Sequence, residues 1–129
     1  MEDKKKISNF TDLRTWEESH KLVLMIYAAT KDFPKDELFG LTSQMRRAAT
    51  SIVSNIAEGF SRQYYSEKIQ FYCMAQGSNT EIQSQLLIAR DLKYLNGESF
   101  DKIWAQSEKA YQLIRGLIGS SKRKNLSNS

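Results

Sequence analysis

The side chains best suited to chemistry in this sequence are few and far apart. The chain has a single histidine, His20, and a single cysteine, Cys73. A nucleophilic triad needs a base beside its nucleophile, while zinc and di-iron sites need several Cys, His or carboxylate ligands. The sequence also lacks a Gly-rich phosphate loop and a dinucleotide-binding fingerprint. We therefore expect no catalytic residues, no metal site and no cofactor.

Two carboxylates, Glu58 and Glu81, leave one enzymatic alternative open. Carboxylate oxygens suit hard divalent cations, so this pair could serve a metal-dependent nuclease. Their spacing does not require them to act together, and both are also natural partners for arginines nearby in the sequence. We place this alternative behind two binding roles described below.

Polar residues on otherwise apolar segments are more informative. If the segments 42–58 and 66–95 form a helical hairpin centred near Arg62, Arg47 lies opposite Ser78, one turn from Glu81. An Arg47–Glu81 pair would then fix the register of the two helices more than it would add stability. Alternatively, the guanidinium groups of Arg46, Arg47 and Arg62 could contact phosphates. We favour the structural pair and keep these three arginines as the candidate nucleic-acid contacts.

The positive charge of the chain is concentrated near its end. Lys and Arg number 19 and Asp and Glu 15, a net charge of +4, but Lys122, Arg123 and Lys124 stand together. Without those three residues the balance is 16 against 15, so the rest of the chain is close to neutral. We interpret the basic cluster as a solvated tail, with non-specific phosphate contact as the alternative.

Four amphipathic segments must position these side chains. Apolar residues recur every three or four positions, which predicts helices over about 12–31, 42–58, 66–95 and 99–118. In the first helix the expected core face contains Leu13, Trp16, His20, Val23, Tyr27 and Thr30. Thr11 or Asp12 could cap the start of this helix, and Ser99 the start of the last.

The glycines mark expected ends and close contacts. Gly59 stands where a left-handed residue would end the second helix, and Asn96-Gly97 would end the third. Gly77 lies inside the third helix, where glycine costs roughly 0.5–1 kcal/mol relative to alanine. It therefore suggests close approach of another backbone, although a tolerated surface glycine is the alternative.

The apolar run Leu22–Ala29 has no polar face. A helix of this kind is covered on more than one side, and a second subunit could supply the additional cover. We therefore list Val23, Ile26 and Gly77 as candidate oligomer-interface residues. The run is also far shorter than the ~20 residues of a membrane helix, so we expect no membrane contact and a cytoplasmic location.

The short connections predict an all-α fold, an antiparallel up-down four-helix bundle. The expected organisation is a flexible N-terminal segment over residues 1–11, one bundle domain over 12–119 and a disordered basic tail over 120–129.

A family resemblance covers most of the chain from Trp16 to Leu95 and is specific over Gly40–Gly59. Phe33-Pro34, the stretch Glu37–Ala49, Ser51-Ile52 and the stretch Asn55–Gly59 resemble the 23S rRNA intervening-sequence proteins, also called the bacterial four-helix bundle protein family. Similarity continues on the third helix with residues Phe71, Ala75, Gly77-Ser78, Glu81, Gln85-Leu86 and Tyr94-Leu95.

This resemblance implies a four-helix bundle that assembles as a ring-like homopentamer without enzymatic activity. Its relatives include accessory proteins of diversity-generating retroelements, which contact a reverse transcriptase and nucleic acid. Those accessory proteins are basic, whereas this chain without its terminal cluster is nearly neutral. Two functional hypotheses follow: a homo-oligomer that binds RNA or DNA or a partner that handles nucleic acid, and a protein-interaction scaffold with no direct nucleic-acid contact.

Overall fold

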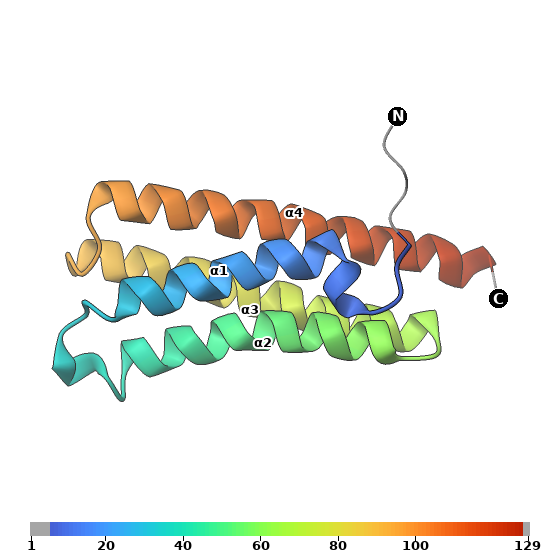
Figure 1. Ribbon diagram of the computed structural model, residues 1–129, viewed down its shortest axis with the longest axis horizontal. Coiled ribbons are helices and arrows are strands. Elements are labelled where there is room, and N and C mark those ends of the chain that lie inside the picture. The colour runs from blue at the N-terminus through green and yellow to red at the C-terminus, as the bar shows by residue number, and fades with distance from the viewer. Residues whose placement is uncertain (1–5, 128–129) are drawn as a thin grey trace.

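The computed structural model describes residues 6–127. Residues 1–5, in the segment expected to be flexible, and residues 128–129, at the end of the expected disordered tail, lie outside this range. Among the described residues the secondary structure is helical, without strands, and the chain is an all-α bundle (Figure 1).

Four long helices form the bundle: α1 (Arg14–Thr30), α2 (Leu41–Ser61), α3 (Tyr65–Asp91) and α4 (Gly97–Ser127). Short 3₁₀ turns, η1 (Phe10–Asp12) and η2 (Lys35–Glu37), precede α1 and α2. Each helix packs on its sequence neighbours, and α4 packs back on α1. Over the described residues α1 and α3 therefore stand diagonally opposite, as do α2 and α4. The predicted antiparallel up-down topology is confirmed.

The chain is already ordered before α1. The side chain of Asn9 accepts a hydrogen bond from the backbone N–H of Thr11, and the carboxylate of Asp12 accepts one from the N–H of Asn9. This reciprocal capping closes η1. Phe10 then contacts Trp16 edge to face, with 5.3 Å between ring centroids. Residues 9–12 therefore form a defined turn within the segment expected to be flexible. The N-cap position of α1 itself is Leu13, which makes no side-chain cap hydrogen bond, so the expected cap at Thr11 or Asp12 is wrong.

The core face of α1 is rotated from the one expected. Its buried residues are Thr15, Glu18, Ser19, Leu22, Val23, Ile26 and Thr30. Trp16 and His20 lie half-buried at the edge of this face, and Tyr27 is exposed. The buried face predicted from periodicity was wrong because the Leu22–Ala29 run is apolar on all sides. In such a helix only the contacts with the other helices decide which side is buried.

The glycine that α2 and α3 need for close packing is Gly59. A Cβ placed on Gly59 would lie 2.6 Å from Cε1 of Tyr72 and 3.0 Å from Cβ of Phe71. Gly59 is helical, α2 continues to Ser61, and no described glycine has a positive φ. The expected left-handed end at Gly59 is therefore wrong. Conversely, a Cβ on Gly77 would meet nothing within 4 Å, so no backbone approaches it inside the subunit.

Lys93 and Asn96 shape the turn between α3 and α4. Lys93 adopts a left-handed conformation with φ of 67°. The N–H of Tyr94 donates to the carbonyl of Ala89 and that of Lys93 to Arg90, which is a Schellman ending. Asn96 then caps α4, its Oδ1 accepting from the N–H of Ser99 at 2.8 Å. The helix therefore starts earlier than expected, and the capping residue is Asn96 instead of Ser99.

Helix α4 does not end near Gly119. It continues to Ser127, so the expected disordered tail is wrong for residues 120–127. Ser121 is buried, and its hydroxyl donates to the carbonyl of Leu117 at 2.8 Å. Lys124 reaches over the ring of Tyr65, with 5.8 Å from Nζ to the centroid. Contacts with α3 thus stabilise a polar helix end that the composition alone would leave unfolded.

We predict opposite outcomes for alanine at the two glycines of the α2–α3 hairpin. Gly59→Ala should lower the free energy of unfolding by roughly 1–3 kcal/mol, because the buried Tyr72 ring has no room to move. Gly77→Ala is the matched control and should raise stability by up to about 1 kcal/mol. Urea denaturation of both variants measures this, and equal effects at both positions would contradict the packing described.

Candidate interaction surfaces

Arg46, on α2, spans the seam between α2 and α1. Its Nε donates to Oγ1 of Thr30 at 2.9 Å and its Nη2 to the carbonyl of Tyr27 at 3.4 Å. The guanidinium also lies 4.8 Å from the centre of the Tyr27 ring. Two hydrogen bonds and one ring contact satisfy this side chain within the subunit, so it serves first to join α1 to α2.

Arg62, at the end of α2, is also held inside the subunit. Its Nη2 lies 3.1 Å from the carboxylate of Glu58, and its guanidinium lies 4.5 Å from the centre of the Phe71 ring. The side chain thereby connects the last turn of α2 to the first turns of α3. Sixteen residues separate it from Arg46, roughly 24 Å along a helix. These arginines do not form one basic surface.

The expected Arg47–Glu81 pair does not form. Among the described residues no ion pair joins them, and Glu81 accepts a hydrogen bond from Nε2 of Gln85 at 3.0 Å. The polar contact across the hairpin is between the hydroxyls of Ser51 and Ser78, 2.9 Å apart. Ser51 rather than Arg47 stands opposite Ser78, so the register is about one turn from the expected one. Arg47 is exposed, the most accessible of the three arginines.

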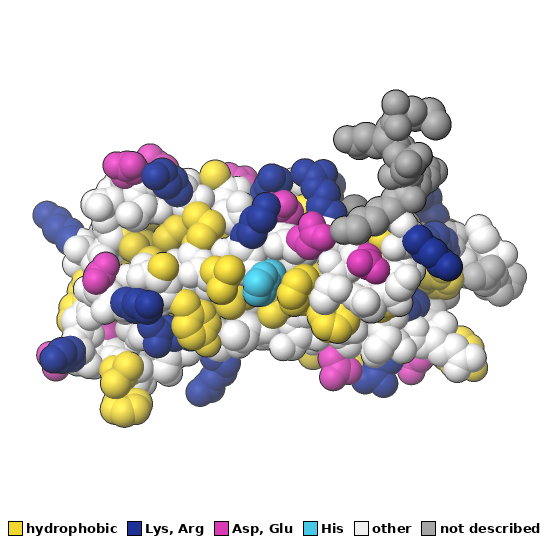
Figure 2. All heavy atoms as spheres, in the orientation of Figure 1, with side chains coloured by type: hydrophobic (Ala, Val, Ile, Leu, Met, Phe, Trp, Pro, Cys, Tyr) yellow, Lys and Arg dark blue, Asp and Glu magenta, His cyan; other side chains and the backbone are white. Residues whose placement is uncertain are grey.

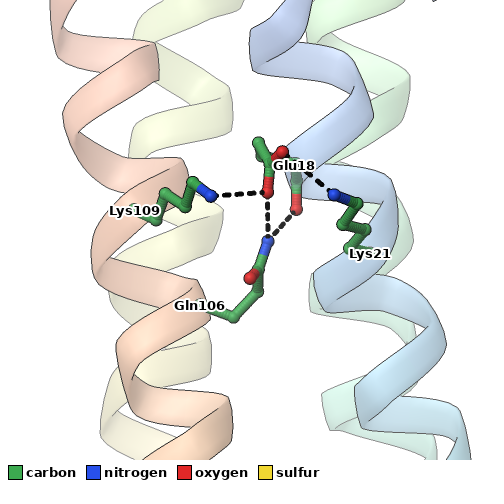
Figure 3. A network of polar contacts seen from close by, with 4 residues as sticks. All are labelled: Glu18, Lys21, Gln106 and Lys109. Carbon is green, nitrogen blue, oxygen red and sulfur yellow. Dashed lines mark hydrogen bonds and ion pairs between the residues drawn. The ribbon is translucent and has the colours of Figure 1, made fainter.

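A buried carboxylate that the sequence analysis missed lies between α1 and α4. Glu18 is only 6% exposed. Nε2 of Gln106 donates to its Oε1 at 3.0 Å and to its backbone carbonyl at 2.7 Å, while Lys21 and Lys109 lie 3.2 Å and 3.4 Å from its carboxylate (Figure 3). The hydrogen bond from Gln106, supported by both lysines, outweighs burial and lowers the pKa of Glu18 to about 2.

Helix periodicity could have suggested this network. Glu18 lies one turn from both Thr15 and Leu22, and Gln106 and Lys109 follow one another by one turn on α4. The sequence alone did not show that the turn of α1 around Glu18 faces the turn of α4 around Gln106 and Lys109. Because a buried charged carboxylate needs its partners, the contacts of Glu18 with Gln106 and Lys109 fix how α1 and α4 are aligned.

The outer side of α1 carries a largely apolar stripe, half-buried at Trp16 and His20 and exposed at Leu24 and Tyr27. Trp16 and His20 stack with ring centroids 4.8 Å apart. Leu24 is 56% exposed and Tyr27 37%. Figure 2 shows hydrophobic side chains on both sides of the one histidine. Val23 and Ile26, the predicted interface residues, are instead buried in the core of the subunit, because they face the other helices.

A second exposed stripe follows the outer side of α3. Met74, Gly77, Glu81, Ser84, Ile88 and Leu92 recur at steps of three and four, and all six are exposed. Met74, Ile88 and Leu92 are 55%, 46% and 51% exposed. Apolar side chains lie toward both ends of this stripe, and Gly77, Glu81 and Ser84 lie in its middle. Gly77 keeps its place as a candidate interface residue, with open space above it.

The end of α4 forms a pocket with α3 and the N-terminal segment. Its volume is about 230 Å³, and its lining includes Phe60, Tyr65, Lys68, Ser120 and Lys124. Nζ of Lys68 donates to the carbonyl of Phe60 at 2.7 Å. Burial lowers the pKa of Lys68, and the charge of Lys124 lowers it further. Among the ion pairs of residues 6–127, none includes either lysine.

Two features are absent from residues 6–127. Within that part of the chain, no group of three or more His, Cys, Asp or Glu side chains is arranged to hold a metal ion. None of its helices has the length and apolar character needed to cross a bilayer.

Comparison with known proteins identifies the family. The family model of the 23S rRNA-intervening sequence protein matches residues 11–116. This chain belongs to that family. The match spans the bundle from η1 through most of α4, so the resemblance drawn over residues 16–95 is confirmed.

A solved structure shares the fold of this 23S rRNA-intervening sequence family member. It is a protein of unknown function from the S23 ribosomal protein family of Bacteroides thetaiotaomicron, with a TM-score of 0.75 and 22% sequence identity. The alignment covers 81% of this chain and 95% of that one. No curated protein matches the chain.

We predict that Glu18→Gln destabilises this family member at neutral pH by roughly 1–3 kcal/mol, because the variant loses the charge that Gln106 and the lysines stabilise. The pKa of Glu18 falls from 4.5 to about 2 on folding. The carboxylate therefore stabilises the fold fully above about pH 4.5, and the contribution disappears as the pH falls through about 2. Urea unfolding of wild type and variant across this range should show the difference shrinking with acid.

Glu98→Gln is the matched control, since its carboxylate is 80% exposed and pairs only with Lys102 one turn away. It should change stability by no more than about 0.5 kcal/mol. A Glu18→Gln difference that stays constant down to pH 2 would contradict a stabilised buried carboxylate.

Proposed function

We propose that this chain is a non-enzymatic subunit of a homo-oligomer, assembled through the outer sides of α1 and α3, that binds RNA through the basic end of α4. The observation that carries the assembly is the pair of stripes with exposed large apolar side chains, on two helices that stand diagonally opposite in the bundle. Large apolar side chains concentrated on a surface mark interaction sites.

The placement of the two stripes favours a head-to-tail contact. Two different surfaces on opposite sides of a subunit can join copies repeatedly, and such contacts give a ring if the rotation closes and a filament otherwise. The α1 stripe offers the exposed Leu24 and Tyr27, while the α3 stripe has the small residues Gly77 and Ser84 on either side of Glu81. Protruding side chains seated over small residues would allow close helix packing. The family resemblance implies a ring of five subunits.

Two charge substitutions test the assembly. Leu24→Asp and Ile88→Asp each place a carboxylate in one stripe, so each variant alone should have the mass of a monomer by light scattering. A mixture should form heterodimers, because each variant keeps the stripe that the other has lost. Leu38→Asp, at an exposed leucine outside both stripes, is the control and should leave the oligomer mass unchanged.

Circular dichroism should give all three variants wild-type helicity, since these leucine and isoleucine side chains lie outside the core. Two results would contradict the head-to-tail contact: unchanged mass in both stripe variants, or a mixture that stays monomeric. A wild-type mass that grows without limit with concentration would exclude the closed ring.

RNA binding is supported by charge at one end of the bundle. Because α4 is helical to Ser127, Lys122, Arg123 and Lys124 are held on a folded helix end, and of the three Lys124 lies near Lys68. Fixed cations bind phosphates with less loss of conformational freedom than a solvated tail does. Of the arginines expected to bind, only Arg47 is exposed, so it remains a secondary candidate.

Titration of a single-stranded RNA at two salt concentrations tests this role. The affinity for RNA should fall steeply as the salt concentration rises. In the variant with Gln at positions 122–124, the slope of the logarithm of the binding constant against log salt should become smaller by about 2, which is about 0.7 for each lost phosphate contact. Gln at Lys31, Lys35 and Lys102 gives the same charge change at the other end of the bundle and should leave the slope nearly unchanged. Equal effects of both triples would contradict a localised site.

A protein-interaction scaffold without nucleic-acid contact is the second candidate. It is favoured by Arg46 and Arg62, whose guanidinium groups are held by contacts within the subunit. An oligomer that behaves as proposed in light scattering but binds no RNA at low salt would select this alternative.

A further inference from the structure

We propose that the pocket between α3 and the end of α4 receives one nucleotide carrying a terminal phosphate, the 5′-phosphorylated end of an RNA. This assignment rests on the RNA binding proposed above and specifies where the chain end is held. The pocket is lined by ten residues: Ile7, Leu13, Phe60, Tyr65, Lys68, Tyr72, Leu117, Ser120, Ser121 and Lys124.

The positive charges of Lys68 and Lys124 in the pocket favour the binding of an anion. Lys68 and Lys124 lie close enough for the charge of one to lower the pKa of the other, and among the described ion pairs no carboxylate neutralises either. Burial raises the pKa of the Tyr72 hydroxyl to about 12, so this phenol adds no negative charge at neutral pH. Two ammonium groups without a carboxylate partner in a concave site repel each other until an anion binds.

The number of charges favours a phosphate monoester over a diester. A terminal phosphate carries about −1.5 to −2 charges at pH 7, whereas each phosphate inside an RNA chain carries one. Two ammonium groups match the dianion. The hydroxyl of Ser120, also in the lining, is a further donor available to phosphate oxygens.

The walls of the pocket suit the rest of a nucleotide. Phe60 and Tyr65 bring two partly exposed aromatic rings, and Leu13 and Leu117 extend the apolar surface around the buried Tyr72. Aromatic side chains stack on bases of any sequence. A volume of about 230 Å³ is smaller than most small-molecule sites, which suits one nucleotide unit and not a strand passing through.

Two parts of the fold create this pocket. Lys68 is directed by its hydrogen bond to the carbonyl of Phe60, near the last turn of α2. Lys124 is present only because α4 runs past Gly119, and it is placed over Tyr65. The segment before η1 adds Ile7 to the rim. The site therefore depends on packing between parts of the chain far apart in sequence.

A matched pair of lysine variants tests the site. An eight-nucleotide RNA with a 5′-phosphate should bind the wild-type protein about tenfold more tightly than the same RNA with a 5′-hydroxyl. Lys124→Gln should abolish this preference. Lys122→Gln removes the same charge from the same helix end, outside the lining, and should retain the preference. Both substituted side chains are exposed, so both variants should keep wild-type melting temperatures.

Competition separates nucleotide recognition from simple anion binding. Adenosine monophosphate should displace the 5′-phosphorylated RNA at concentrations where inorganic phosphate does not. Equal displacement by both would overturn the nucleotide assignment. Equal affinity for the two RNA ends, or equal loss in Lys122→Gln and Lys124→Gln, would overturn the site while leaving RNA binding intact. Absence of binding to either RNA at low salt would instead defeat the proposed function itself.

Discussion

The contact of the Tyr72 ring with Gly59 is the constraint on which one end of this bundle depends. The ring is 2% exposed and lies where any side chain at position 59 would be. This contact brings α2 and α3 together just before their connection, which places Phe60 beside Lys68. The same ring lines the pocket that the end of α4 covers. A close helix contact thus shapes a surface site as well as the core.

Polar groups buried between helices set the alignment that apolar packing leaves open. Leucine and isoleucine stripes can slide by a turn at modest cost, whereas a charged or hydrogen-bonded group must meet its own partner. Glu18 with Gln106 aligns α1 with α4, and Ser51 with Ser78 aligns α2 with α3. Nδ2 of Asn79, donating to the carbonyl of Ser107 at 3.1 Å, aligns α3 with α4. These contacts connect three of the four seams of the bundle.

The outer surface divides into regions of different chemistry because the four helices use their inner faces for one core. Helices α1 and α3 keep apolar residues on their outer sides, while α4 carries polar and basic residues toward its end. Helix α3 illustrates the consequence, since its apolar residues serve both the core and the outer stripe. A subunit that assembles through α1 and α3 would leave the end of α4 available to a second partner.

The sequence by itself determined the helices, their order and the family. Periodic apolar residues, few glycines and one proline allow little besides four helices joined by short turns, and residues 40–59 were specific enough to indicate the family. The Leu22–Ala29 run showed the limit of this approach. Periodicity cannot choose the buried side of a helix that is apolar all round, so Val23 and Ile26 were assigned to an interface although they lie in the core.

Only the tertiary structure decided which side chains meet. The hairpin register differs from the expected one by about one turn, which replaces an Arg47–Glu81 pair with the contact between Ser51 and Ser78. Gly59, which was expected to end a helix, makes the close helix contact, whereas Gly77, for which a close contact was expected, has open space around it. The reason is that the neighbouring helix, and not the local sequence, decides how much space surrounds a glycine. The end of α4 is folded because α3 offers it contacts. Local sequence sets which conformations are accessible, and packing between distant segments selects among them.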